Sequence, residues 1–350
     1  MMNKPRAIVS GYYGKGNAGD EALLLSLLQM LPPSITPIVL SADPTATRAV
    51  CGVESIPRRS LFPVLSSFST ADLFIWGGGS LLQDVTSLPS PYYYLGLMIF
   101  AQRVGLKTFA WSQGIGPVKA QITQKLTKSV LHNCTKISVR DNASAKLLQD
   151  WEIPCLIAPD PVWSLESYPV KEVQKIRSPR VAVNLRPTAA LTPSRLSYLT
   201  KALKDFQLAT NASLIFLPFQ VSQDLPLIKQ VTAELSGDYH ILCLDDPRAL
   251  KGVFRGVEML IGMRYHSFVM AIAEGCRCFA LSYDPKVTQL QLELSIPGWH
   301  LANLPESADL ISTTWLNEYV NGHSLNSAQI QSLVDRSWLH QQLYKEYFYE

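Results

Sequence analysis

Charge is scarce in this sequence, and neither basic nor apolar residues gather into long runs. Charged residues make up 17% of the 350 residues, and 31 Lys and Arg against 28 Asp and Glu leave a formal net charge of +3. Without a basic run, a dedicated nucleic-acid-binding protein is excluded, although local anion sites remain open. Hydrophobic residues make up 47%, which excludes disorder for most of the chain. At roughly 100–200 residues per domain, the length predicts two domains.

Cysteine is rare as well. The six cysteines are scattered and stand mostly beside Val, Leu or Ile. This is too sparse for a secreted fold held by disulfides, so we interpret them as buried thiols. Cys276 and Cys278 share one face of an apolar strand, and no paired His or Cys motif accompanies them. The sequence therefore predicts no bound metal and no other resident cofactor.

Targeting and membrane-spanning segments are also lacking. The chain passes from a short basic start into a strand at Arg6, without the apolar stretch of a signal peptide. The most apolar run, 92–101, is too short to cross a bilayer and is followed by Gln102 and Arg103. We therefore expect a cytoplasmic protein.

Short apolar strands instead alternate with stretches of helical periodicity, which is typical of βαβ units and a parallel sheet. In the first half we expect strands at 6–10, 37–41, 72–76, 108–112, 136–139 and 155–158, and helices at 21–31, 92–104, 122–132 and 142–151. In the second half we expect strands at 181–185, 213–217, 240–242, 259–261 and 276–281, and helices at 193–210, 224–235 and 267–274. The fold class is α/β.

Composition sets the expected domain boundaries. We predict a Rossmann-like domain over 1–165, a linker of mixed charge with two prolines over 166–180, and a second Rossmann-like domain over 181–325. The segment 326–350 is an aromatic-rich helix that packs back on the first domain. Two doubly wound domains facing each other across a cleft would place the ligand at the carboxyl ends of the strands.

The first strand runs into a glycine loop, GYYGKGNAGDE. Its glycines spell the dinucleotide-binding fingerprint, and Asp43 stands near the position of a ribose-binding acid. Asp20 and Glu21, however, lie in the first helical turn, where two carboxylates repel a phosphate. They suit sugar hydroxyls, and Asp20 could also take a proton from an attacking hydroxyl. The alternative is that both only stabilise the helix N-terminus.

Two further loops follow strands of the first half. In WGGGSLLQD, three consecutive glycines allow close approach to a ligand, although a plain tight turn would also use them. In SVRD, Arg140 points toward the ligand or pairs with Asp141 or Asp160.

Cationic residues gather at strand ends in the second half. Arg264 and His266 follow a strand and stand beside a helix N-terminus, where an anion can be held by guanidinium donors and free amides. Lys286 lies in the next strand-end loop, and Arg186 follows the first strand of this half. His266 can deliver a proton near neutral pH. This set suits a small polyanion and an acid-catalysed reaction.

Seven motifs, in order, resemble those of the polysaccharide pyruvyl transferase family, especially its bacterial cell-wall members: GYYGKGNAGDEA, WGGGSLLQD, SQGIGP, SVRD, PDPVW, GMRYHS and YDPKV. The resemblance covers residues 6–290. It implies a glycosyltransferase-B-like fold and transfer of the enolpyruvyl unit of phosphoenolpyruvate onto a sugar of a cell-wall or exopolysaccharide precursor. The products are a pyruvate ketal and phosphate. If that precursor is lipid-linked, contact with the inner face of the plasma membrane is expected, although no basic amphipathic helix indicates it.

The resemblance also implies roles for individual residues. His266 is the general acid and Asp20 the catalytic residue on the acceptor side. The donor-binding residues are Arg264, Lys286, Arg186, Arg140 and Ser267. The acceptor-binding residues are Gly14, Asn17, Gly19, Gly78, Gly79 and Gln83. Two other functions stay open: a sugar-nucleotide glycosyltransferase of the same fold, with Glu274 reaching a ribose, and a dinucleotide-dependent oxidoreductase.

Overall fold

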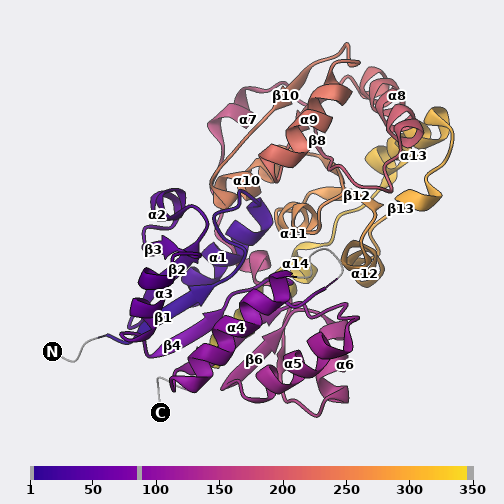
Figure 1. Cartoon of the computed structure of the whole chain (residues 1–350). Coiled ribbons are helices and arrows are strands. Elements are labelled where there is room, and N and C mark those ends of the chain that lie inside the picture. The colour runs from indigo at the N-terminus through magenta and orange to yellow at the C-terminus, as the bar shows by residue number, and fades with distance from the viewer. Residues whose placement is uncertain (1–3, 85–88, 345–350) are drawn as a thin grey trace. The chain divides into compact units, whose positions relative to one another are not determined.

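The computed structural model describes residues 4–84 and 89–344, and the chain divides into two compact units (Figure 1). The N-terminal unit consists of the residues up to Leu165 together with those from Leu333 on, and the C-terminal unit is Glu166–Ser332. Each unit is a parallel sheet whose strands alternate with helices, as the sequence predicts. The segment 166–180, expected as a linker, lies in the C-terminal unit and carries a short helix.

The N-terminal unit has a seven-stranded sheet in the order β3-β2-β1-β4-β5-β6-β7. Its strands are β1 (Arg6–Ser10), β2 (Thr36–Ser41), β3 (Glu54–Pro57), β4 (Leu73–Trp76), β5 (Lys107–Gln113), β6 (Lys136–Val139) and β7 (Leu156–Ile157). Its helices are α1 (Ala18–Met30), α2 (Pro44–Cys51), α3 (Leu61–Phe68), α4 (Pro89–Arg103), α5 (Gln121–His132) and α6 (Asn142–Asp150). A 3₁₀ turn follows at Pro161–Ser164.

The C-terminal unit repeats this plan with six strands in the order β10-β9-β8-β11-β12-β13. The strands are β8 (Arg180–Asn184), β9 (Ser213–Phe216), β10 (Tyr239–Ile241), β11 (Met259–Gly262), β12 (Arg277–Ser282) and β13 (Gly298–His300). The helices are α7 (Lys171–Lys175), α8 (Pro193–Thr210), α9 (Val221–Thr232), α10 (Pro247–Val253), α11 (Tyr265–Ala273), α12 (Pro285–Leu294) and α13 (Ala308–Asn321). Helix α14 (Ser327–Ser337) begins in this unit and ends in the N-terminal unit.

The central strands explain why the apolar runs are continuous rather than alternating. β4 and β11 are buried along their whole length, because helices cover both faces of each parallel sheet. Helix α1 is apolar on nearly all sides for a similar reason. One side packs on the sheet, and another contacts the 3₁₀ turn Pro161–Ser164 and the C-terminal segment.

Both sheets reverse their strand order at one place. In the N-terminal unit the chain winds outward in opposite directions from β1 and β4, and in the C-terminal unit from β8 and β11. Doubly wound sheets bind ligands outside the carboxyl ends of the strands at such a switch point. The glycine loop follows β1 and the three glycines follow β4, while Arg186 follows β8 and His266 follows β11. The two glycine loops, Arg186 and His266 therefore lie at the two switch points, whereas Arg140 follows β6 and Lys286 follows β12.

The C-terminal segment packs on the N-terminal unit, as predicted. After α14, a 3₁₀ turn at Trp338–Gln341 buries the His340 side chain completely. Its Nδ1 lies 2.9 Å from Ser138 Oγ and its Nε2 lies 3.0 Å from the Pro159 carbonyl oxygen. Burial lowers the pKa of His340 to about 4. The neutral imidazole thus ties the C-terminal segment to strand β6 and to the loop after β7.

This low pKa predicts acid sensitivity. The unfolded chain binds a proton on His340 at its ordinary pKa of about 6.5 and the folded chain only near 4, so the folded state loses stability as the pH falls through that window, by up to ~3 kcal/mol. Urea unfolding at several pH values should show a shallower pH dependence for His340→Gln than for the wild type. The exposed His323 supplies the control, since His323→Gln should keep the wild-type slope. Equal slopes for all three proteins would contradict the assignment.

No helix among the described residues is long and apolar enough to cross a membrane.

Candidate active site

The predicted donor-side residues Arg186, Arg264, His266, Ser267 and Lys286 come from neighbouring strand ends of the C-terminal unit. β8, β11 and β12 are paired side by side, with Gly262 opposite both Asn184 and Ala280. Arg186 follows β8, His266 lies in the first turn of α11 after β11, and Lys286 lies in the first turn of α12 after β12. Parallel pairing therefore brings these loops to the same edge of the sheet, as the sequence predicts.

Arg264 stands at the start of α11 and is held by a buried ion pair. Its Nε and Nη2 donate to the two carboxylate oxygens of Asp224 at 2.9 and 2.5 Å, and the two side chains are 8% and 0% exposed. Asp224 also accepts from the backbone amides of Phe219 and Gln220, both at 3.0 Å. The charge that we expect to bind the donor thus has a protein partner already. Arg264 fixes the loop before α11, and its role as a donor ligand stays a prediction.

His266 is half-buried in the first turn of α11. Its ring meets the Tyr265 ring edge-on, with the centroids 5.1 Å apart. The neighbouring Ser267 is fully buried, and its hydroxyl donates to the Arg264 carbonyl at 2.6 Å. Ser267 therefore closes the turn that presents His266 at the sheet edge.

Arg186 is oriented by an aromatic partner. Its Nη1 donates to the Tyr283 hydroxyl at 2.7 Å, and the guanidinium carbon lies 5.0 Å from the centre of that ring. Burial raises the pKa of Tyr283, so the phenol stays protonated. Asn184 links the two central strand ends by accepting from the Arg264 amide at 3.0 Å and donating to the Leu217 carbonyl. Tyr283, Asn184 and Asp224 were not predicted as site residues, since only the tertiary pairing shows their part.

In the N-terminal unit, the glycine loop is held by hydrogen bonds to side chains at the start of α1, the helix that follows it. Asn17 caps α1 by accepting from the Gly19 amide at 3.1 Å. The Glu21 carboxylate accepts from the amides of Gly14 and Lys15 at 2.8 and 3.3 Å. Burial and the nearby Asp20 raise the pKa of Glu21 to about 7, against the effect of these amides. Amides that a dinucleotide pyrophosphate would need are therefore occupied by Glu21.

Asp20 lies over the second glycine loop. A β-carbon placed on Gly79 would stand 3.5 Å from Asp20 Oδ1, so the structure brings together two residues predicted for the acceptor side. Gly79 has a φ of 128°, which strains any other residue. Gly78 has a packing reason, because a β-carbon there would press on Leu23. Gly14 likewise has a φ of 69° and packs against the loop after β2.

Tyr13 explains the first glycine of the triplet. Its side chain is completely buried, and its hydroxyl occupies the space that a β-carbon on Gly77 would need. That hydroxyl has no hydrogen-bond partner among the residues placed by the structure, and burial together with Asp20 raises its pKa. Sequence reasoning did not single out Tyr13. The sequence signal that could have indicated Tyr13 is its position two residues after Gly11, at the end of the first strand.

Gly77→Ala should therefore disrupt this packing. We expect a loss of ~1–3 kcal/mol in the free energy of unfolding, because the completely buried Tyr13 side chain would have to shift to make room for the new methyl group. Gly96 in α4 is the matched control, since nothing lies within 4 Å of its missing β-carbon and Gly96→Ala should stabilise the helix slightly. Urea unfolding of both variants measures the contrast. Equal effects would show that Tyr13 does not fill this space.

The sequence left open whether Arg140 points toward the ligand or forms an ion pair, and in the structure it forms an ion pair. Its Nη1 donates to Asp160 Oδ2 at 2.6 Å, with side chains 5% and 0% exposed, and its Nη2 lies 3.3 Å from Ser80 Oγ. The motifs SVRD, PDPVW and WGGGS thus meet in one cluster. Gln83 is half-buried at the end of this loop, beside Asp84, which binds the amides of Lys119 and Ala120. Arg140 belongs to the N-terminal unit, and its contact with a donor stays a prediction.

Arg58 is a cation of this sheet edge that the sequence did not reveal, because β3 was not predicted. Its guanidinium lies 4.8 and 5.5 Å from the ring centres of Tyr93 and Tyr94. It also donates to the Gly11 carbonyl at 3.4 Å. A half-buried cation therefore stands next to the first glycine loop.

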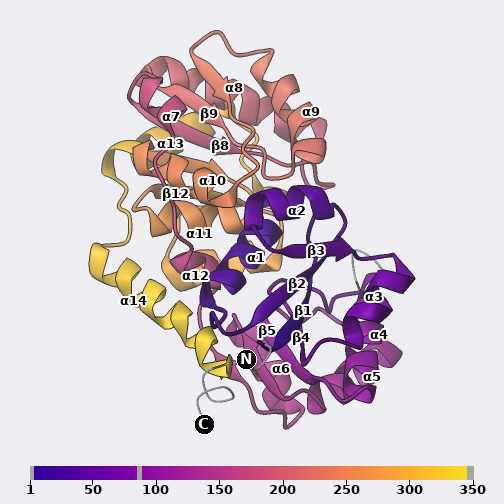
Figure 2. The ribbon, with the colours of Figure 1, turned by 90° about the vertical axis from the view of Figure 1, so that its left-hand side faces the viewer.

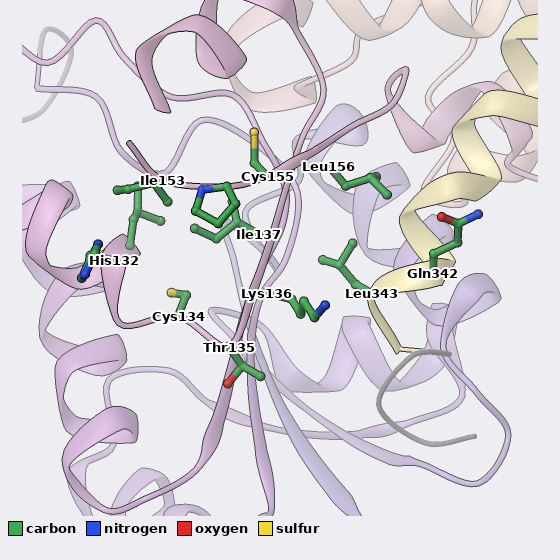
Figure 3. Close-up of a pocket in the computed structure, with 12 residues that line it drawn as sticks. His132, Cys134, Thr135, Lys136, Ile137, Ile153, Cys155, Leu156, Gln342 and Leu343 are labelled. Atoms are coloured by element: carbon green, nitrogen blue, oxygen red, sulfur yellow. The ribbon is translucent and has the colours of Figure 1, made fainter. Parts of the chain in front are cut away.

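A pocket of about 660 Å³ in the N-terminal unit lies away from the glycine loops (Figure 3). It opens at Lys136 and Leu156, the first residues of β6 and β7, and so at the amino edge of the sheet. Cys134 and Cys155 line it, and burial raises the pKa of Cys134 to about 12. Neutral thiols and aliphatic side chains do not suit a small polyanion. Cys276 and Cys278 are also buried with raised pKa values.

The sequence profile of the polysaccharide pyruvyl transferase family matches residues 17–285, most of the chain. The chain belongs to the polysaccharide pyruvyl transferase family. The family match begins after β1, includes Asp20, Arg140, Arg186 and His266, and ends one residue before Lys286. The comparison with curated protein sequences found no significant match.

Comparison with solved structures identifies the fold of this pyruvyl transferase family member. A UDP-GlcNAc 2-epimerase from Methanocaldococcus jannaschii matches with a TM-score of 0.68 at 9% identity, over 99% of this chain and 100% of that one. The enzyme from Neisseria meningitidis matches with 0.67 at 10%, over 98% and 100%. A glycosyltransferase from Rickettsia africae matches with 0.59 at 12%, over 99% and 97%. These likenesses show the glycosyltransferase-B-like fold of two Rossmann-like domains, as predicted.

Proposed function

We propose that this protein transfers the enolpyruvyl unit of phosphoenolpyruvate onto two hydroxyls of a sugar in a cell-wall or exopolysaccharide precursor. The reaction gives a pyruvate ketal and releases phosphate. Membership of the family carries this proposal, and the position of His266 and Arg186 at the C-terminal switch point supports it. We place the donor in the C-terminal unit and the acceptor beside the glycine loops of the N-terminal unit. We further propose that the acceptor is a lipid-linked cell-wall precursor.

The chemistry accounts for the residue types. A proton from His266 adds to the methylene carbon of the enol phosphate and makes it a methyl group, which leaves an oxocarbenium-like centre at C2. One sugar hydroxyl attacks C2 and loses its proton to a base, for which Asp20 is the candidate. A second hydroxyl then displaces phosphate at C2, loses its own proton and closes the ring. Arg186, Lys286 and Arg264 would hold the donor carboxylate and phosphate.

The two other functions fit the geometry less well. A dinucleotide needs the loop amides that Glu21 binds, and Asp43 caps α2 by accepting from the Ala46 amide at 3.0 Å. In a sugar-nucleotide transferase Glu274 would reach a ribose, but here it accepts from the Ser167 hydroxyl at 2.6 Å and from Arg255 Nε at 2.8 Å. Both carboxylates, of Asp43 and of Glu274, already accept hydrogen bonds within the protein, which does not favour either as a ligand of a ribose hydroxyl.

Incubation with phosphoenolpyruvate and a panel of precursor sugars tests the proposal. We expect mass spectrometry to detect one added pyruvyl group on an accepted sugar, with one phosphate released for each. UDP binding measured by calorimetry, together with transfer from a UDP-sugar, would instead support the glycosyltransferase. Fluorescence of added NADH that changes on mixing would support the oxidoreductase.

A further inference from the structure

Large apolar side chains are exposed at the beginnings of three helices of the N-terminal unit. On α3, Leu61 is 70%, Phe62 88% and Leu65 43% exposed. Tyr92 in the first turn of α4 is 42% exposed, and Ile122 in the first turn of α5 is 68% exposed. We call these five residues the first-turn surface. Single exposed apolar residues are ordinary, but a contiguous group marks an interaction site.

Hydrogen bonds show that the three helix beginnings are neighbours. The Tyr93 hydroxyl of α4 donates to the carbonyl of Arg58, three residues before α3, at 2.7 Å. The Tyr92 hydroxyl lies 3.0 Å from the Thr123 hydroxyl of α5. Each of these helices follows a strand of the same parallel sheet, so all three begin at its carboxyl edge. Figure 2 shows α3, α4 and α5 together on one side of the sheet.

Exposed cations stand beside this surface: Arg59 precedes α3, and Lys119 and Lys125 flank the first turn of α5. The other basic residues from 58 to 140 do not add to it in the same way, since Arg103, Lys107 and Lys136 lie at the amino edge of the sheet and Arg140 is buried in an ion pair. The same stretch holds two acidic residues, Asp72 and Asp84. Asp84 is buried against two amides, and Asp72 binds the Arg6 amide at the amino end of the sheet. None of the three helices has an acidic residue in its first turn.

We propose that the first-turn surface docks the protein on an anionic phospholipid bilayer. Leu61, Phe62 and Ile122 enter the boundary between headgroups and acyl chains, and the exposed Arg59 and Lys119 meet lipid phosphates. The surface and the loops that carry Asp20 and Gly79 share the carboxyl edge of one sheet. Docking would therefore bring the proposed acceptor side near lipid-linked substrates. The proposal rests on exposure and charge and does not depend on the transfer reaction.

Sedimentation with vesicles tests this docking directly. The full-length protein should bind vesicles of equal parts phosphatidylglycerol and phosphatidylcholine, and added salt should release it from them. It should not bind vesicles of phosphatidylcholine alone. Leu61→Ser with Phe62→Ser should weaken binding by tenfold or more, on the order of two lost apolar side chains. Arg59→Gln with Lys119→Gln should weaken it about fivefold for each charge removed.

Leu292 and Val320 of the C-terminal unit provide the matched control. They are 78% and 70% exposed, so Leu292→Ser with Val320→Ser also removes two exposed apolar side chains, a somewhat smaller pair than Leu61 and Phe62, and should leave vesicle binding unchanged. Equal loss in both double variants, binding to neutral vesicles, or retention on heparin without vesicle binding would overturn the proposal. Transfer to a water-soluble acceptor should be the same in the wild type and in Leu61→Ser with Phe62→Ser. Failure of docking is thus distinguished from failure of the reaction.

Discussion

Replacing His266 by alanine is expected to abolish ketal formation while the fold is retained. A positioned general acid contributes ~10²–10⁴-fold to a rate, and no other histidine among the described residues lies in the first turn of a helix at the C-terminal switch point. The side chain is half-buried on the first turn of α11, so its removal leaves no large cavity. Phosphate release from phosphoenolpyruvate in the presence of an acceptor measures the effect, and circular dichroism checks the fold.

His240 offers a control in the same unit. It is half-buried on β10 and pairs with Asp238 at 3.4 Å, away from the strand order reversal at β8 and β11. His240→Ala should keep nearly full activity. Full activity of His266→Ala would refute its assignment as the proton donor.

The second large effect concerns stability. Asp224→Ala should lower the free energy of unfolding of the C-terminal unit by ~3–5 kcal/mol, because it leaves the Arg264 guanidinium buried without its carboxylate. The same change removes the acceptor for the amides of Phe219 and Gln220. Urea unfolding followed by tryptophan fluorescence measures this loss.

The exposed ion pair between Lys201 and Asp309 is the comparison. Its partners lie 3.3 Å apart with side chains 63% and 81% exposed. Asp309→Ala should therefore change stability by about 1 kcal/mol or less. If the two variants unfold at the same urea concentration, the buried pair does not organise the switch point as described.

Much of the fold was predictable because its central strands are buried on both faces and therefore read as apolar runs. β1, β6 and α8 were predicted with the bounds that the structure gives. The edge strands β3 and β13 were missed, since they have four and three residues and β3 contains Glu54 and Pro57. Helix α12 was also missed, although Asp284 before Pro285 is a strong helix start.

The candidate site was predictable as a set of strand-end loops, but its internal pairing was not. GMRYHS indicated a cation at a helix start, yet nothing local to it names Asp224, which lies 40 residues earlier in another helix. The alternative partners of Arg140 were foreseen, and the structure selects Asp160. The first-turn surface escaped the sequence because it is assembled from the beginnings of three separate helices, which only the fold brings together.

The central claim is that the C-terminal unit protonates the enol phosphate with His266. Ketal formation in heavy water tests it most directly. The account predicts that mass spectrometry finds one solvent deuterium in the methyl group of each new ketal, and that His266→Ala forms no ketal. A product whose pyruvyl methyl carries no solvent deuterium, or a ketal made equally fast without His266, would contradict it.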